Sequence, residues 1–245
     1  MELKITKCPN CGAPLNISES KINIKCLYCG SEIIIDDGNQ VLKDANQVSK
    51  VNIKNLLDLG ETAFQGEEYE EASNYFNKIL EVDPQNYNAW SRKGDILSLT
   101  STFQEPKLNG MITAYKKAIE YTPKEKKEEM LEYSANLSQM EAFTYYNKIE
   151  DYLGKNISLQ GTWEDYLDRC LKTIELLEFA NECDPYNTDI IEEIIRICKG
   201  NIECKIVYED ENSSKYKKKI TPEYYKKKLK DKMNLFTKKM KQIDI

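Results

Sequence analysis

Four cysteines near the start of the chain have the spacing that points most clearly to chemistry. Cys8, Cys11, Cys26 and Cys29 form the pattern C-x2-C-x14-C-x2-C. In each pair a Gly follows the second Cys, so the chain can turn tightly and direct two thiolates at one ion. This spacing is typical of a tetrahedral Zn²⁺ site. The alternatives are a disulfide pair or four unliganded thiols, and the absence of a secretion signal in the N-terminal sequence disfavours them.

The other four cysteines have no such pairing. Cys170, Cys183, Cys198 and Cys204 lie far apart and mostly on expected helical faces. We predict that they are small apolar core residues.

Other catalytic chemistry is poorly represented in the chain. There is no histidine, which removes the commonest general base and every His-ligated metal site. None of the ten glycines builds a phosphate-binding loop. We therefore expect a protein that is not an enzyme. No apolar run approaches a membrane span, so we expect it to be cytoplasmic, and its many Lys, Asn and Ile residues favour a bacterial origin.

Charge is distributed unevenly along the chain. The formal net charge is −6. Residues 41–212 carry 19 basic and 33 acidic side chains, a net −14, whereas residues 213–245 carry 12 lysines and three acids, a net +9. An acidic body is thus joined to a basic tail.

The cysteine pairs must be held by short strands. Strand-like runs cover 13–17, 21–25 and 32–35, with Ile22 and Ile24 alternating with polar residues. With its two Cys-x2-Cys-Gly turns, this region resembles the bacterial zinc ribbon over about residues 5–36. The resemblance implies that the four thiolates hold one structural Zn²⁺ in a domain spanning residues 1–36. A domain this small needs such a metal because its apolar core is too small to stabilise it alone.

Residues 37–50 are polar and are predicted to be a linker. Two helical stripes follow, the first broken at Gly66 and the second ended by Asp83-Pro84. The 34 residues that start at Ile53 resemble the tetratricopeptide repeat, a helix–turn–helix unit. The matching signature residues are Leu56, Leu59, Gly60, Ala63, Ala72, Phe76, Ile79 and Pro84.

Further repeats are predicted after the first. A second begins at Tyr87 and is interrupted over 101–108. A third has an overlong first helix, about 124–153, and a partner helix over 163–183. The side chains of the partner helix that are expected to point inward are Tyr166, Cys170, Ile174, Leu177 and Ala180. Asp184-Pro185-Tyr186-Asn187 then echoes Asp83-Pro84-Gln85-Asn86. We expect a mostly α fold in which a tetratricopeptide-like α-solenoid forms one superhelical body over residues 51–200; an ordinary helical bundle is the alternative.

The last part of the chain is expected to be an irregular connector over 201–220 and a basic amphipathic helix over 221–245. The apolar stripe of that helix comprises Tyr225, Leu229, Met233, Phe236, Met240 and Ile243. We predict that this stripe caps the solenoid. Binding of the helix to nucleic acid or to an anionic membrane surface are the alternatives.

The repeat resemblance implies a concave groove, lined by the first helix of each repeat, that binds a segment of a partner protein. The predicted groove positions are Leu57, Glu61, Phe64, Asn88 and Asp95. Its acidic side chains favour a basic or amphipathic partner, unless Glu61 and Asp95 are merely solvated surface acids.

These features predict a non-enzymatic cytosolic adaptor that joins a zinc-ribbon head to a protein-binding repeat scaffold. A nucleic-acid-associated regulator that uses the ribbon and the basic tail is the alternative. The ribbon itself contains no Arg to read a base edge, which disfavours nucleic acid as the partner of the head.

Overall fold

The computed structural model describes residues 4–8, 13–17, 23–26, 28, 32–36, 39–42, 45–203, 205–210 and 215–243. The chain divides into two compact units, an N-terminal unit over 1–96 and a C-terminal unit over 97–245. This division falls inside the range 51–200 for which the sequence predicts one continuous stack.

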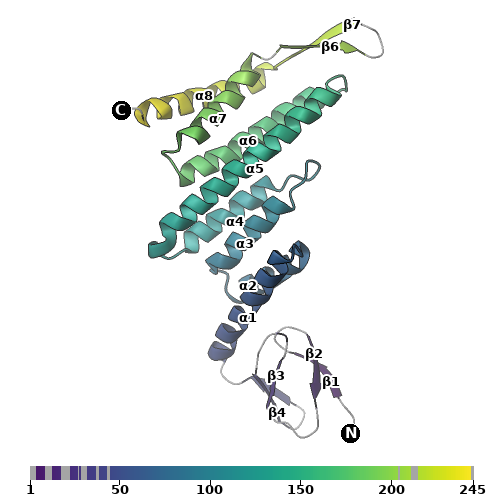
Figure 1. Cartoon of the computed structure of the whole chain (residues 1–245), viewed down its shortest axis with the longest axis vertical. Coiled ribbons are helices and arrows are strands. Elements are labelled where there is room, and N and C mark those ends of the chain that lie inside the picture. Colours follow the sequence, from purple (N-terminus) through teal and green to yellow (C-terminus); the bar gives the residue numbers. More distant parts are fainter. Residues whose placement is uncertain are drawn as a thin grey trace. The chain divides into compact units, whose positions relative to one another are not determined.

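Figure 1 shows the elements, coloured in chain order. The strands are β1 (Lys4–Lys7), β2 (Pro14–Ile17), β3 (Asn23–Lys25), β4 (Glu32–Asp36), β5 (Asn39–Leu42), β6 (Lys205–Asp210) and β7 (Lys215–Ile220). The helices are α1 (Ala45–Gln65), α2 (Tyr69–Val82), α3 (Tyr87–Leu99), α4 (Leu108–Tyr121), the short 3-10 helix η1 (Lys124–Lys126), α5 (Lys127–Asn156), α6 (Thr162–Cys183), α7 (Thr188–Ile202) and α8 (Glu223–Ile243).

The chain begins with short antiparallel strands. β1 pairs with β2, and β3, β4 and β5 form a three-stranded sheet in that order. The predicted linker over 37–50 therefore differs from the structure, because β5 and the first turns of α1 lie within it. Val41 is opposite Ile34 and Leu42 is opposite Ile33, so apolar residues that a linker would expose extend the ladder beside β4.

Helices α1 and α2 form the helix pair that the first signature predicts. Gly60 allows the close approach, since a Cβ at this position would lie 2.9 Å from the Phe76 ring. Ala72, Phe76 and Ile79 are fully buried in α2. The turn between the helices contains Glu67 with a positive φ of 60°.

The two echoed Asp-Pro segments build the same local structure in different units. Asn86 accepts a hydrogen bond from the backbone N–H of Ala89 and donates one to Asp83, at 3.1 Å each. Asn187 repeats this arrangement, capping α7 through the N–H of Ile190 at 3.4 Å. These caps satisfy backbone donors at the start of α3 and α7, which explains why the motif recurs.

The C-terminal unit is built from long helices that lie side by side (Figure 1). α5 packs along α6, α6 packs against α7, and α7 packs against α8. The inward side chains predicted for α6 are all buried: Tyr166, Cys170, Ile174, Leu177 and Ala180.

Three of the four cysteines outside the two Cys-x2-Cys turns belong to this core, as predicted. Cys170, Cys183 and Cys198 are buried, whereas Cys204 lies outside the described residues. Burial raises the pKa of the Cys183 and Cys198 thiols to about 12 in each case. Both therefore stay protonated near neutral pH and are poor nucleophiles and metal ligands.

Helix α8 covers the end of the helical stack, as predicted. Leu229 and Phe236 are almost completely buried, and the rest of the predicted stripe packs against the same core. Polar contacts fix the helix: Lys232 forms an ion pair with Glu178 at 2.7 Å, and the Tyr225 hydroxyl donates to Asp168 at 2.8 Å.

The predicted irregular connector contains a β-hairpin. β6 pairs antiparallel with β7, so that Ile206 is opposite Lys219 and Tyr208 is opposite Lys217. Ile206 and Tyr208 are half-buried, whereas Val207 between them is exposed, as expected for a strand with one covered face. The lysine-rich sequence of β7 does not by itself predict a strand. Pairing with β6 holds this segment in the extended conformation.

Candidate partner-binding surfaces

The predicted groove residues of the N-terminal unit lie on two neighbouring helices. Leu57, Glu61 and Phe64 lie half-buried on α1, and Asn88 is exposed on α3. Asp95 differs from the prediction, because it is only 4% exposed.

Arg92 explains the burial of Asp95 and is the residue that the sequence reasoning missed. Its guanidinium pairs with Glu61 at 2.6 Å and with Asp95 at 2.9 Å, and its carbon lies 4.9 Å from the centre of the Phe64 ring. Burial alone would lower the pKa of Arg92, but the bonds to Glu61 and Asp95 raise it above its ordinary value, so the charge is permanent. Both predicted groove acids thus share one guanidinium, and the three side chains together carry a net charge of −1. The acidic character expected of this surface is therefore reduced, because one of the two negative charges is balanced within the chain.

The signal that could have found Arg92 was weak. It stands three residues before Asp95, which places both side chains on one helical face. Its pairing with Glu61 joins α3 to α1, and no single-helix pattern contains that contact.

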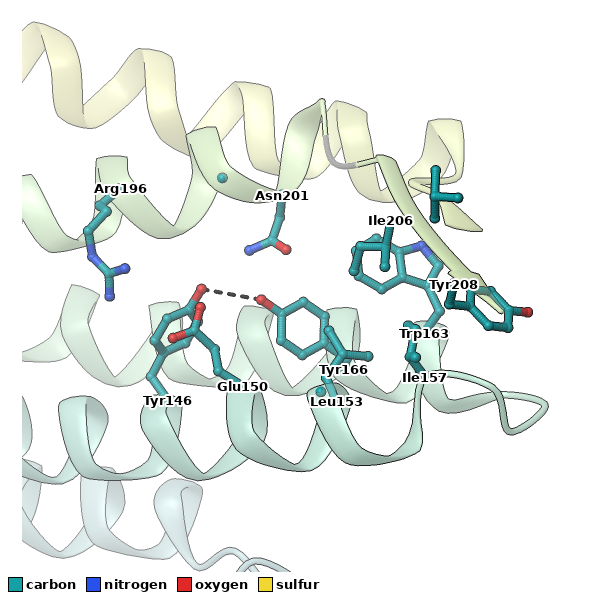
Figure 2. A pocket seen from close by; sticks show the side chains of 13 residues that line it. Tyr146, Glu150, Leu153, Ile157, Trp163, Tyr166, Arg196, Asn201, Ile206 and Tyr208 are labelled. Atoms are coloured by element: carbon teal, nitrogen blue, oxygen red, sulfur yellow. Dashed lines mark hydrogen bonds between the residues drawn. The ribbon is translucent and has the colours of Figure 1, made fainter. Parts of the chain in front are cut away.

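A pocket of about 480 Å³ lies in the C-terminal unit. It is formed by α5, α6, α7 and β6, with the hairpin as one wall (Figure 2). In the register predicted from the sequence, α5 and α7 would be first helices of repeats, the class expected to line a groove. The side chains and backbone that line the pocket belong to Tyr146, Glu150, Leu153, Gly154, Ile157, Trp163, Tyr166, Arg196, Gly200, Asn201, Ile206, Val207 and Tyr208.

One end of the pocket is polar. Figure 2 shows Arg196 reaching from α7 toward Tyr146 and Glu150 on α5. The Arg196 guanidinium carbon lies 5.1 Å from the centre of the Tyr146 ring, and two nitrogens of that group bind Glu193 at 2.8 and 2.6 Å. Glu193 therefore neutralises Arg196.

Glu150 is the exposed acid at this polar end, and its carboxylate interacts with the Tyr146 hydroxyl and with the charge of Arg196. It is exposed and forms no ion pair with any residue that the structure describes. A cationic group on a ligand could pair with its carboxylate.

The floor of the pocket carries two buried phenols. The hydroxyls of Tyr146 and Tyr166 lie 3.3 Å apart, joining α5 to α6. Burial raises the pKa of both tyrosines well above the ordinary value, so both stay neutral and can donate hydrogen bonds.

The other end of the pocket is apolar. Leu153, Ile157 and Ile206 line it together with Trp163, whose ring stacks on Tyr166 with centroids 5.3 Å apart. The Trp163 N–H donates to the backbone oxygen of Ile220 at 3.2 Å, which ties α6 to the end of the hairpin. This end has the shape and chemistry to hold a large apolar side chain.

Sequence reasoning did not find this pocket. It correctly placed Tyr166 inward, but the signature positions of the repeat do not extend to Glu150 or Arg196. Ile206 contributes only because the hairpin folds back beside α6.

Two of the four predicted zinc ligands belong to the described residues. Cys8 follows β1 and is 2% exposed, and Cys26 follows β3 and is 1% exposed. The backbone N–H of Cys8 donates to the Ala13 oxygen at 2.8 Å, so Ala13 lies beside Cys8. Cys11 and Cys29 lie outside the described residues.

The family model of the tetratricopeptide repeat matches residues 53–86. This match confirms the repeat that the sequence predicts at the α1–α2 pair, a unit that mediates protein–protein interaction. No curated protein matches the chain. None of the helices in the described ranges combines the length and apolar character that a bilayer span requires.

Proposed function

We propose that this protein is a non-enzymatic adaptor whose helical repeats bind a segment of a partner protein. The observation that carries the proposal is the pocket between α5 and α7, which has an apolar end and, at the other end, the exposed acid Glu150. The repeat match at residues 53–86 supports the same class of function.

The chemistry of the pocket defines the segment that it would accept. A large apolar side chain would enter between Leu153, Ile157 and Ile206, out of contact with water. A Lys or Arg nearby in the same segment would reach the Glu150 carboxylate. One of the Tyr146 and Tyr166 hydroxyls donates to the other, and the remaining hydroxyl proton would donate to a backbone oxygen of the bound chain.

Peptide selection on the full-length protein tests this proposal. A random twelve-residue phage library should yield peptides that pair an aromatic or aliphatic residue with Lys or Arg. Glu150→Gln should weaken a selected peptide by up to about five-fold, the scale of one exposed charge pair. Ile206→Glu should weaken the same peptide more than ten-fold, because it places a charge at the apolar end.

Glu132→Gln is the matched control, since Glu132 is also exposed on α5 but does not line the pocket. It should leave affinity unchanged, and thermal melts should show that all three variants are folded. Selected peptides without this composition, or binding that neither pocket substitution changes, would exclude the pocket as the partner site.

We also propose that Cys8, Cys11, Cys26 and Cys29 hold one structural Zn²⁺. The burial of Cys8 and Cys26 supports it, since structural thiolates are shielded from water. Elemental analysis of protein purified without chelator should find about one zinc per chain. Cys8→Ser should lose it, whereas Cys183→Ser in the helical core should retain it; zinc-free wild-type protein would refute the site.

A further inference from the structure

The outer surface of α8 carries a row of exposed lysines, which we term the α8 lysine face. It consists of Lys227, Lys228, Lys230, Lys238 and Lys241, all exposed. None of the five forms an ion pair with a carboxylate in the described part of the chain. By contrast, Lys232 and Lys239 point toward the core and bind Glu178 and Asn181. The helix therefore keeps its body-facing lysines occupied and presents the rest to solvent.

The apolar stripe of α8 is already used within the chain. Leu229 is 1% exposed and Phe236 is 2% exposed, both packed in the C-terminal core. A basic amphipathic helix that lies on a membrane inserts its apolar face among the lipids. Because that face is buried here, the available surface of α8 is ionic, which favours a water-soluble polyanion over a bilayer.

Local charges reinforce this surface. Only Glu223 and Asp231 oppose the lysines on α8, and Glu223 is paired with Lys226 at 2.7 Å. Lys217 and Lys218 are exposed on β7, just before the helix begins, and extend the positive charge. Elsewhere the chain is acidic, so a polyanion would be directed to this face and repelled from the remainder.

The spacing of the lysines suits a nucleic-acid backbone. Lys227 and Lys241 are separated by about 21 Å along the helix at about 1.5 Å per residue, which corresponds to roughly six phosphates of one strand. Tyr224 adds an aromatic surface, being 61% exposed, with the Lys228 ammonium 4.4 Å from its ring centre. An exposed ring beside lysines is the combination on which single-stranded bases stack.

We infer that the α8 lysine face binds single-stranded nucleic acid, with the lysines on the phosphates and a base on Tyr224. The face contains lysine and no arginine, so it contacts phosphates without reading base edges. RNA and DNA share this phosphate chemistry. This binding site is separate from the pocket and does not depend on the proposed partner segment.

Fluorescence anisotropy of the full-length protein with labelled dT20 and rU20 tests the inference. Five phosphate contacts predict that log affinity falls with log salt at a slope of about −3.5, a loss of about 100-fold between 50 and 200 mM. Replacing Lys227, Lys230 and Lys238 by Gln should reduce the slope to about −1.4, or about seven-fold over the same range. Equal binding of both oligonucleotides would assign the contact to phosphates, and a preference for rU20 would add a contact to the 2′-hydroxyl.

Two further variants make the test specific. Replacing Lys124, Lys126 and Lys172 by Gln makes the same change in net charge at exposed positions away from α8, and should leave the slope unchanged. Tyr224→Ala should weaken dT20 about ten-fold without changing the slope, because stacking is not ionic. Unchanged affinity in Tyr224→Ala would overturn the assignment to single strands.

The remaining outcomes each contradict the inference. Absence of binding at 50 mM salt, or an equal effect of the control triple variant, would show that the α8 lysine face is only solvated. Binding to phosphatidylserine vesicles without binding to either oligonucleotide would assign the face to a membrane surface. Displacement of dT20 by polyglutamate of equal charge at equal concentration would identify an acidic protein as the ligand.

Discussion

The α1–α2 pair and the α5–α6 pair are packed together by different kinds of side chain. In α1–α2, Gly60 lies against the Phe76 ring so closely that a Cβ would be 2.9 Å away. In α5–α6, Tyr145, Tyr146, Trp163 and Tyr166 fill the interface instead. A Gly at the contact lets a facing ring approach the helix backbone closely, whereas several large rings fill a wider space between helices.

The difference accounts for where a binding pocket forms. The α1–α2 pair, which has the family signature, is tightly packed, so a partner could bind only to its outer surface. The pair that departs from the signature holds buried phenols and an indole beside open space. The positions that identify a repeat are therefore not the positions that build its site.

The largest effect should come from removing the central ring of either pair. Phe76 is fully buried and Trp163 is 1% exposed, so each Ala substitution should lower the free energy of unfolding by about 3–5 kcal/mol. Urea denaturation followed by circular dichroism measures both. A cost below about 1 kcal/mol for Trp163→Ala, with the full cost for Phe76→Ala, would show that only the signature pair depends on its ring.

Much of the helical fold was predictable because its signals are local. The helix pair beginning at Ile53, the overlong α5 and the inward face of α6 follow from apolar spacing and from Gly and Pro stops. The two Asp-Pro-x-Asn caps were visible as an internal echo. Each of these signals is complete within one helix and the turn beside it.

The unpredicted features all depend on distant residues. Arg92 neutralises Glu61 across 31 positions of sequence, and Ile206 reaches the pocket only through the hairpin. Strand pairing in β5 and β7 was missed because their own sequences are polar, and the partner strand determines the pairing. The candidate site was therefore less predictable than the helices that hold it.

The next largest effect on stability should distinguish Gly60 from Gly154, each of which follows a leucine. Gly60→Ala should cost about 1–3 kcal/mol, because its Cβ would overlap a Phe76 ring that is packed on all sides. Gly154→Ala on α5 should instead stabilise the protein by up to about 1 kcal/mol, since a Cβ there meets nothing within 4 Å and Ala favours a helix. Urea denaturation of both variants checks the signs. Destabilisation of equal size would mean that α5 is as tightly packed as α1.

The smallest effect on stability concerns the buried acids, which have different partners in the two regions. In the N-terminal unit Arg92 neutralises Asp95, but Glu141 on α5 has the Ser98 hydroxyl as a neutral partner at 3.2 Å. Burial raises the pKa of Glu141, with the hydrogen bond from Ser98 opposing the shift. At pH values between the ordinary pKa of about 4.5 and the raised pKa of Glu141, the folded protein binds more protons than the unfolded chain. Stability therefore falls as pH rises through that window and stays reduced above it.

Glu141→Gln keeps the acceptor for Ser98 and removes the charge, so it should cancel this loss. We expect the variant to equal the wild type near pH 4 and to exceed it by about 0.5 kcal/mol at pH 7, the usual scale for such a polar substitution. Urea denaturation at the two pH values measures the difference in the free energy of unfolding between the variant and the wild type. The other acids titrate alike in both proteins, so their contribution cancels. A variant less stable than the wild type at pH 7 but not at pH 4 would show that the fold stabilises the Glu141 carboxylate. In that case both regions would pair their buried acids, and the contrast between them would be limited to ring size.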